Sequence, residues 1–472
     1  MPKQIPDHVF RGYDLRGLVG SELNAETVEL LGKGYATWLL RRRIYDCVVG
    51  YDCRISSPEF RDVIVKTLTE SGITVYDIGM TLSQIVYFAC YYFRTRGMIM
   101  ITASHNPKEY NGFKFGTGYS STMETEEIIQ LREQVKTGNF SSRSPKGKLI
   151  PKDIKQDYIE DLIRRVDVIG KFKVVVDSCA ATTGIYLPEI LRKAGCEVIE
   201  QNTKPDGNFP VGTPDPTERE VQERLAERVV AEKADLGFSY DCDGDRVGIV
   251  DNEGGLIWND TLVSIFSIDI LDYLPGSKIV YNALCSKQVD EVIRQHNGEP
   301  VMWKTGHSFI KAKTKEIGSV FGGELSGHFF FLDNFYGHDD GAIASLRLLA
   351  YLTRVKKSLK QVVAELPQYV SSPEIKVGCP DAIKFKVVSD SIGGEIKKLY
   401  PDARYVEIDG VRMDTKNEML IVRASQNGPY LTVKFEGKTH ETYDNLKRQV
   451  SELLHKFPEV DLQNGVNTAA LE

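Results

Sequence analysis

Short apolar strands alternate with helical patterns three times along the chain, and this repeat restricts its fold more than any other feature. Strands are predicted to begin the three repeats at residues 46–50, 173–176 and 278–281, and a stretch of helical periodicity follows each one. Strands that are apolar on both faces are typical of parallel sheets covered by helices. The repeat therefore predicts three related α/β domains with mixed, mainly parallel sheets.

The C-terminal part of the chain has a different pattern. Strands are predicted close together at residues 405–408, 418–422 and 430–435, and helical patterns lie on either side, at residues 390–400 and 443–456. This order favours a smaller C-terminal α+β domain. We expect the last residues, 464–472, to be frayed.

A chain of 472 residues is too long for a single hydrophobic core. Domain boundaries are expected in the polar segment 141–152, at the glycine pair 254–255 and near the prolines of segment 367–373. The predicted domains are residues 1–150, 151–254, 255–369 and 370–472.

The composition excludes several classes of protein. Hydrophobic residues make up 42% of the chain and charged residues 26%, which is typical of a globular protein and not of a disordered or fibrous one. The net charge of -7 argues against a nucleic-acid partner. We expect no membrane partner, because the chain shows neither a signal peptide nor an apolar stretch of membrane-spanning length. Eight scattered cysteines without zinc-site spacing favour reduced thiols and a cytoplasmic location.

Ser104 lies in the first of four loops whose residues are suited to chemistry. The loop follows the apolar strand predicted at residues 98–102 and reads Thr-Ala-Ser-His-Asn-Pro, with Lys114 ten residues after the serine. Ligands of open α/β sheets gather beyond the carboxyl ends of such strands. A serine whose proton and charge are managed by neighbours acts as a nucleophile or phosphoryl carrier. The alternative is a plain turn in which Ser104 and Asn106 cap the backbone, and the local spacing does not decide between the two.

Three carboxylates alternate in the second loop, directly after the apolar strand that ends at Ser239. Asp241, Asp243 and Asp245 lie within five residues of one another. Two carboxylates about 4 Å apart repel by several kcal/mol, so three that converge require a cation or a proton. Oxygen ligands favour magnesium, calcium or manganese over zinc, and the position of the glycine does not fit an EF-hand. We interpret the loop as a metal site; the alternative is a polar turn whose acids point into solvent.

Two further loops carry residues suited to a sugar or a phosphate. Glu324, Ser326 and His328 lie in a glycine-rich segment, downstream of His307. They supply acceptors, a donor and an imidazole. Taken alone, however, the segment favours a glycine-rich turn with a solvated glutamate, and a lone histidine such as His307 is more often structural than catalytic. In the tail, the segment Arg-Ala-Ser-Gln-Asn-Gly at residues 423–428 suits a phosphate clasp, and its Asn-Gly pair is also a hairpin signal.

Taken in this order, the four loops resemble those of the α-D-phosphohexomutase superfamily, and most closely its phosphomannomutase/phosphoglucomutase branch. The resemblance covers essentially the whole chain, including Phe-Arg-Gly-Tyr-Asp-Leu-Arg-Gly at residues 10–17 and Lys-Pro-Asp-Gly-Asn-Phe-Pro at residues 204–210. It implies four domains around one central cleft. In chain order they would carry the phosphoserine loop, the metal-binding loop, the sugar-recognition loop and the phosphate-binding loop.

The resemblance also implies an activity and a set of site residues. The activity is the interconversion of hexose 1-phosphate and hexose 6-phosphate, of mannose or glucose, through a phosphoserine enzyme and a hexose 1,6-bisphosphate that also serves as activator. The implied catalytic residues are Ser104, His105, Lys114, Arg16 and His328. One Mg²⁺ would be held by Asp241, Asp243, Asp245 and Ser104. The implied substrate-binding residues are Tyr13, Arg246, His307, Glu324, Ser326, Arg423, Ser425 and Asn427.

The chain departs from the branch in two places. The phosphate loop reads Ser-Gln-Asn-Gly at residues 425–428, where relatives often have Ser-Asn-Thr-Thr, so amide and backbone donors must replace two hydroxyls of the clasp. Leu284 stands near a position where relatives often place a lysine that contacts the sugar, and this leaves the sugar open. Leu325 argues against the glucosamine branch. A phosphoglucosamine mutase, a magnesium-dependent sugar phosphatase with Asp241 as nucleophile and a sugar-phosphate sensor are the alternatives. The expected partners are small hexose phosphates, and the expected state is a monomer or homodimer.

Overall fold

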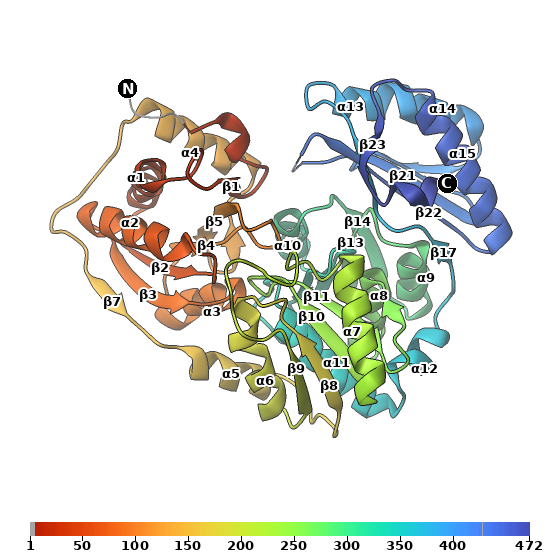
Figure 1. The fold of residues 1–472 in the computed structure, drawn as a ribbon, viewed down its shortest axis with the longest axis horizontal. Coiled ribbons are helices and arrows are strands. Elements are labelled where there is room, and N and C mark those ends of the chain that lie inside the picture. Colours follow the sequence, from red (N-terminus) through yellow and green to blue (C-terminus); the bar gives the residue numbers. More distant parts are fainter. Residues whose placement is uncertain (1–4, 427) are drawn as a thin grey trace. The chain divides into compact units, whose positions relative to one another are not determined.

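The computed structural model describes residues 5–426 and 428–472. The chain forms two compact units, which we describe separately: unit 1 comprises Met1–Asn259 and Ser326–Val362, and unit 2 comprises Asp260–Leu325 and Val363–Glu472. Figure 1 shows the fold, coloured from red at the N-terminus to blue at the C-terminus, with many of the helices and strands labelled. No helix of the described residues is long and apolar enough to span a membrane. All eight cysteines are buried and free.

The first sheet of unit 1 has a parallel centre and an antiparallel edge. Its strands lie in the order β1 (Leu15–Leu18), β5 (Tyr110–Gly118), β4 (Met98–Ile101), β2 (Asp46–Tyr51), β3 (Thr74–Met80) and β7 (Leu149–Pro151), with β6 (Ser121–Thr122) beside β5. Strands β4, β2, β3 and β7 run parallel to one another, whereas β5 pairs antiparallel with both β4 and β1. The antiparallel strands were not predicted from the sequence.

Helices cover this sheet through the apolar faces of their sequences. They are α1 (Ala25–Arg41), α2 (Ser57–Glu70), α3 (Ser83–Phe93) and α4 (Thr125–Thr137). In α2, Phe60, Ile64 and Leu68 recur at helical spacing and are buried in the core. Helix α1 was not predicted; it begins with a capping box in which the side chains of Asn24 and Thr27 satisfy each other's backbone N–H groups.

The second sheet of unit 1 repeats this plan. Its strands lie in the order β12 (Leu256–Ile257), β11 (Val247–Asp251), β10 (Leu236–Tyr240), β8 (Lys173–Asp177) and β9 (Glu197–Gln201). Strands β10, β8 and β9 are parallel, and β11 turns back antiparallel to β10. The remaining elements of unit 1 are α5 (Lys155–Arg164), α6 (Leu187–Lys193), α7 (Arg219–Glu232), β16 (Phe329–Phe331) and α11 (Gly341–Val355).

Unit 2 begins with a parallel arrangement of β14 (Glu299–Trp303), β13 (Lys278–Asn282) and β15 (Phe321–Gly323). The helices of this part are α8 (Asn259–Leu271), α9 (Lys287–Gln295) and α10 (His307–Glu316), and α12 (Leu359–Ala364) follows later in the chain. The prediction of three α/β domains with mixed sheets is confirmed.

The rest of unit 2 is an antiparallel sheet with helices, as the C-terminal pattern predicted. Its strands lie in the order β19 (Arg404–Val406), β20 (Val411–Asp414), β21 (Glu418–Ala424), β22 (Tyr430–Gly437), β18 (Ile375–Gly378) and β23 (Asp461–Val466), and β17 (Val370–Ser371) pairs with β22. Its helices are α13 (Lys384–Lys386), α14 (Gly393–Leu399) and α15 (His440–His455).

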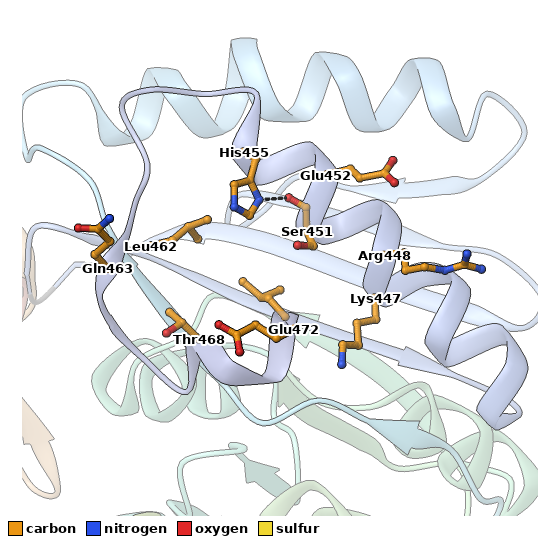
Figure 2. A pocket seen from close by; sticks show the side chains of 10 residues that line it. Lys447, Arg448, Ser451, Glu452, His455, Leu462, Gln463, Thr468 and Glu472 are labelled. Atoms are coloured by element: carbon orange, nitrogen blue, oxygen red, sulfur yellow. Dashed lines mark hydrogen bonds between the residues drawn. The ribbon is translucent and has the colours of Figure 1, made fainter.

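The prediction that residues 464–472 are frayed is wrong. Strand β23 pairs with β18, and a short 3-10 helix at Thr468–Leu471 places Leu471 in the core of the sheet. Figure 2 shows the pocket between α15 and the chain end, where His455 Nδ1 lies 2.8 Å from the carbonyl oxygen of Ser451. Its lining residues are Lys447, Arg448, Ser451, Glu452, His455, Leu462, Gln463, Thr468, Leu471 and Glu472. The polar composition of this segment hid the pairing from sequence reasoning.

Candidate active site

Two loops of unit 1 that were selected from the sequence meet in space. One follows β4 and carries Ser104; the other follows β10 and carries the three aspartates. Ser104 Oγ donates a hydrogen bond of 2.7 Å to Asp241 Oδ2 and lies 3.1 Å from His105 Nδ1. Residues far apart in sequence therefore form one polar cluster beyond the carboxyl ends of two buried strands.

The backbone at Ser104 has a left-handed conformation that is uncommon for a residue with a side chain. Its φ is 50°, and its N–H donates to Thr102 Oγ1 at 2.8 Å. The N–H of Asn106 donates to the carbonyl of Ala103 at 3.0 Å, which closes a turn. The turn expected as the plain alternative is present, but the Ser104 hydroxyl points to Asp241 instead of capping the backbone. Strained residues of this kind cluster at functional sites.

The three aspartates are fully buried and converge. One oxygen of each lies within 4.8 Å of the others, and their exposed fractions are 1% or less. Asp241 Oδ1 accepts the backbone N–H groups of Gly244 and Arg246, and the tight turn places Gly244 at a φ of 76°. Burial and the neighbouring carboxylates raise the pKa of Asp241 to about 8. The alternative of a polar turn with solvated acids is therefore wrong.

Lys114 is the principal cation beside the aspartates. It projects from β5, is 3% exposed, and its Nζ lies 2.7 Å from Asp243 Oδ2 and 2.5 Å from Asp245 Oδ2. Burial by itself raises the pKa of Asp243, but Lys114, the Ser83 hydroxyl and Arg16 outweigh burial and lower it. The sequence placed Lys114 near Ser104 only by separation along the chain; the antiparallel turn of β5 brings it to the aspartates.

Two arginines predicted as site residues border the cluster. Arg246 donates through Nε to Asp241 Oδ2 and through Nη1 to Asp215 Oδ1, both at 3.1 Å. Arg16 Nη1 donates to Asn106 Oδ1 at 2.7 Å, and its Nε donates to Asp14 Oδ2 at 2.9 Å. Both arginines are therefore fixed by carboxylates while they face the Ser104 loop or the metal-site loop.

The donor set fits a divalent cation. Asp243 Oδ1 and Asp245 Oδ1 are buried and have no hydrogen-bond partner among the described residues, so two anionic oxygens remain unsatisfied despite the contact of Lys114. A buried acceptor without a hydrogen bond is costly even when a cation pairs with the other oxygen of the same carboxylate, and a hard cation with oxygen ligands relieves that cost. Asp241, Asp243 and Asp245 are the residues that would hold such an ion.

The predicted histidines of unit 1 lie beside carboxylates. His105 Nε2 is 3.9 Å from Asp215 Oδ2, and His328 Nδ1 is 2.9 Å from Asp339 Oδ2 and 3.7 Å from Asp245 Oδ1. An adjacent carboxylate stabilises the protonated imidazole. Tyr13 is buried in the same unit, and Ser326 is partly buried.

Unit 2 contains the remaining predicted residues, and Asp409 connects two of their loops. Glu324 is 1% exposed, and its Oε1 accepts the N–H of Gly306 at 2.7 Å, next to the buried His307 at the start of α10. Asp409 Oδ2 accepts the N–H of Thr305 at 2.9 Å and the Nε–H of Arg423 at 2.8 Å. Ser425 is also buried. Asn427 lies outside the described residues.

Comparison with known sequences assigns the family. The sequence models of phosphoglucomutase/phosphomannomutase α/β/α domains I, II and III match residues 7–142, 156–255 and 258–370. Together these matches cover more than half of the chain. The chain belongs to the phosphoglucomutase/phosphomannomutase family. The resemblance inferred from its loops is confirmed.

Members of this family are similar to the chain over almost its whole length. A phosphomannomutase/phosphoglucomutase of Pseudomonas syringae is 36% identical over 97% of this chain and 97% of its own. A phosphoglucomutase of Neisseria gonorrhoeae is 31% identical over 95% of this chain and 97% of its own. The crystal structure of a phosphoglucomutase/phosphomannomutase family protein from Burkholderia thailandensis has a TM-score of 0.88 and 30% identity, and the match covers 96% of this chain and 98% of that one.

Sequence reasoning missed several residues that shape the site in this family member. Arg54, Asp215 and Asp409 each bind a predicted residue or its loop. Asp52 and Arg54 lie just after the end of β2. Ser104 and Asp241, which were selected from the sequence, likewise lie just after the ends of β4 and β10. Asp215 and Asp409 lie in irregular segments, where no periodic pattern marks a residue as functional.

Proposed function

We propose that this protein is a phosphohexomutase that interconverts hexose 1-phosphate and hexose 6-phosphate, with mannose or glucose as the sugar. The reaction would proceed through a phosphoserine at Ser104 and a hexose 1,6-bisphosphate intermediate, which also serves as activator. Relatives named phosphomannomutase/phosphoglucomutase support the reaction class. The observation that carries the assignment to Ser104 is its hydroxyl, which is buried and 2.7 Å from Asp241 in the aspartate cluster.

We propose Mg²⁺ as the metal, held by Asp241, Asp243, Asp245 and the oxygen carried on Ser104. The convergence of three buried carboxylates and the unsatisfied oxygens of Asp243 and Asp245 support this choice. When bound, Mg²⁺ would neutralise charge on the phosphoryl group that is transferred.

The cations of unit 1 have proposed roles in binding and orientation. Phosphoryl transfer depends mainly on positioning and on neutralising charge, and Lys114, Arg16 and Arg246 bring positive charge to the Ser104 and aspartate loops. His328 is proposed to give and take the proton of the sugar hydroxyl, because Asp339 beside its Nδ1 stabilises the protonated ring. His105 is proposed to orient the Ser104 oxygen, which lies 3.1 Å from its Nδ1.

The substrate-binding roles remain proposals for each unit separately. In unit 2, Glu324 and His307 are proposed to bind the sugar, and Arg423 and Ser425 the phosphate that is not reacting. In unit 1, Ser326 and Tyr13 are proposed to contact the substrate. The phosphate contact proposed for Asn427 rests on the sequence alone. The domain boundaries near residues 150, 254 and 369, the shared cleft, a cytoplasmic location and a monomeric or homodimeric state are further proposals.

Intact-mass analysis before and after addition of glucose 1,6-bisphosphate tests the proposal. We expect one added phosphate, located on Ser104 by tandem mass spectrometry and discharged by mannose 1-phosphate or glucose 1-phosphate. Ser104→Ala is expected to take up no phosphate and to lose about a thousandfold or more in turnover. The matched control is Ser121→Ala, a serine of the same domain on the edge strand β6.

A different modified residue would reject the mutase mechanism. Phosphate on Asp241, accompanied by release of inorganic phosphate without isomerisation, would identify a sugar phosphatase instead. Binding of hexose phosphate without any phosphorylation of the protein would identify a sensor. Substantial turnover by Ser104→Ala with bisphosphate present would also contradict the role of Ser104.

A further inference from the structure

Arg54 contacts the Ser104 loop and uses every donor of its guanidinium group. It follows β2 and is 1% exposed. Its Nη2 donates to the carbonyls of Ser104 at 2.6 Å and Asn106 at 2.7 Å, and its Nη1 donates to those of Pro107 at 2.9 Å and Tyr110 at 3.1 Å. The fifth donor, Nε, bonds Asp52 Oδ2 at 3.1 Å. An arginine has five such donors, so none is left over.

The four carbonyls that Arg54 binds lie within seven consecutive residues, 104–110, which run from the Ser104 loop to the first residue of β5. Carbonyl oxygens that point at a common centre repel one another unless a cation lies between them. Ser104 also has a φ of 50°. A left-handed conformation costs a residue with a side chain about 1–2 kcal/mol, so the loop persists only when its surroundings fix it. Arg54 supplies four of the bonds that do so.

Arg54 is itself held rigidly from several sides. Asp52 Oδ1 accepts the backbone N–H of Arg54 at 3.0 Å and the hydroxyl of Ser57 at 2.7 Å. Asn111 Nδ2 donates to Ser57 Oγ at 3.0 Å, and the guanidinium carbon lies 5.0 Å from the centre of the Phe209 ring. Asp52, Ser57 and Asn111 are all completely buried, so this network is shielded from water.

We propose that Arg54 is a positioning residue for phosphoryl transfer, because it holds the Ser104 loop in the conformation that directs the hydroxyl to Asp241. The role rests on the proposed function of Ser104 as phosphoryl carrier. Lysine cannot replace Arg54, because an ammonium group has three donors on a flexible stem and cannot bond four carbonyls and a carboxylate in one plane. Arg54 does not touch the reacting atoms and acts through the loop.

Arg54→Lys tests the proposal, with Arg61→Lys as its matched control. Arg61 lies in the same domain on α2 and bonds Asp62 and Asp77, not the Ser104 loop. For Arg54→Lys we expect kcat to fall about a hundredfold while KM changes less than about threefold, because a misplacement of about 1 Å costs that much in rate and the proposed substrate-binding residues are untouched. We expect the control to keep both parameters within about threefold.

Hydrogen exchange of the amides at residues 102–110 is the readout that needs no activity. We expect exchange in this segment to be at least about tenfold faster in Arg54→Lys than in the wild type, and unchanged in Arg61→Lys. If the wild type takes no phosphate on Ser104, the proposed function fails, but the exchange result still decides whether Arg54 fixes the loop.

Two results would overturn the role of Arg54. One is unchanged exchange at residues 102–110 in a folded Arg54→Lys variant, and the other is a kcat as high as that of Arg61→Lys. If Arg54→Lys shows no cooperative unfolding transition, the test uses Asp52→Asn instead. This substitution removes the carboxylate charge that orients Arg54, and asparagine keeps the shape of the aspartate side chain. We then expect a loss of kcat of about tenfold with faster loop exchange, and wild-type values of both would overturn the proposal.

Discussion

Replacing Lys114 by methionine isolates the electrostatic balance of the aspartate cluster. The variant keeps much of the volume of the lysine side chain and removes the only charge within 2.7 Å of Asp243 Oδ2 and Asp245 Oδ2 among the described residues. Removing one partner of a buried ion pair costs about 3–5 kcal/mol, because the other charge stays buried. We therefore expect the free energy of unfolding to fall by about that amount in metal-free buffer.

Magnesium is expected to reverse part of this loss. Without the ammonium group, two more carboxylate oxygens are open to a cation, so the variant gains more stability from Mg²⁺ than the wild type does. At a concentration a hundred times the dissociation constant, a bound ion adds about 2.7 kcal/mol of stability. Urea unfolding of both proteins with EDTA and with saturating MgCl₂ measures the difference.

Lys434→Met is the matched control. Lys434 is equally buried and its Nζ lies 2.8 Å from Asp260 Oδ2 in unit 2. Glu436 is a second carboxylate that acts on it, but no group of three converging carboxylates includes this pair among the described residues. We expect a comparable loss of stability and no added response to Mg²⁺. Equal responses of the two variants to Mg²⁺, or a loss below about 1 kcal/mol in Lys114→Met, would refute the electrostatic account of the cluster.

Two further substitutions probe the surroundings of the site. Asp409→Asn weakens the charge-assisted bond that holds Arg423. In a coupled steady-state assay we expect KM for the hexose phosphate to rise about fivefold, while kcat stays within about twofold of the wild type. An unchanged KM would argue against the role of Arg423. Burial raises the pKa of Asp340 to about 7, although the hydrogen bond donated by the Tyr158 hydroxyl acts to lower it. The native Asp340 carboxyl therefore holds a proton that the same carboxyl releases above about pH 4 in the unfolded state. The contribution of Asp340 to wild-type stability should therefore be lost as the pH rises from about 4 to about 7. Urea unfolding should show that Asp340→Asn loses less stability, relative to the wild type, over this range; the same pH dependence in both proteins would contradict the assignment.

The centre of each α/β sheet was predictable because its strands are apolar on both faces. Runs such as residues 173–176 and 278–281 carry that pattern without interruption. Strand β5 was not predicted because glycine and polar residues interrupt its apolar pattern. The miss matters for function, since β5 is the strand that carries Lys114 to Asp243 and Asp245.

The candidate site was predictable where an unusual group of charged residues directly follows a buried strand. Asp241, Asp243 and Asp245 stand out because three alternating acids have no structural reason to follow an apolar strand. Ser104 was less conspicuous in the sequence. Its hydrogen bond to Asp241 is the observation that favours a serine that carries phosphate over an ordinary turn residue. Such a bond joins positions 137 residues apart, and local patterning carries no information about it.

Arg54 shows why the supporting residues are harder to find than the reacting ones. Its partners are backbone carbonyls, which every sequence has, so no side-chain motif announces the contact. The structural feature that identifies Arg54 is its burial. A fully buried arginine needs an acceptor for each donor, and a loop with converging carbonyls is one of few surroundings that supply enough acceptors. The same demand fixes both partners, because the loop without the arginine leaves four carbonyls facing one another and the arginine without the loop leaves four donors unsatisfied. The arrangement of the Ser104 loop is therefore set through its backbone carbonyls and not through the side chains that are proposed to react.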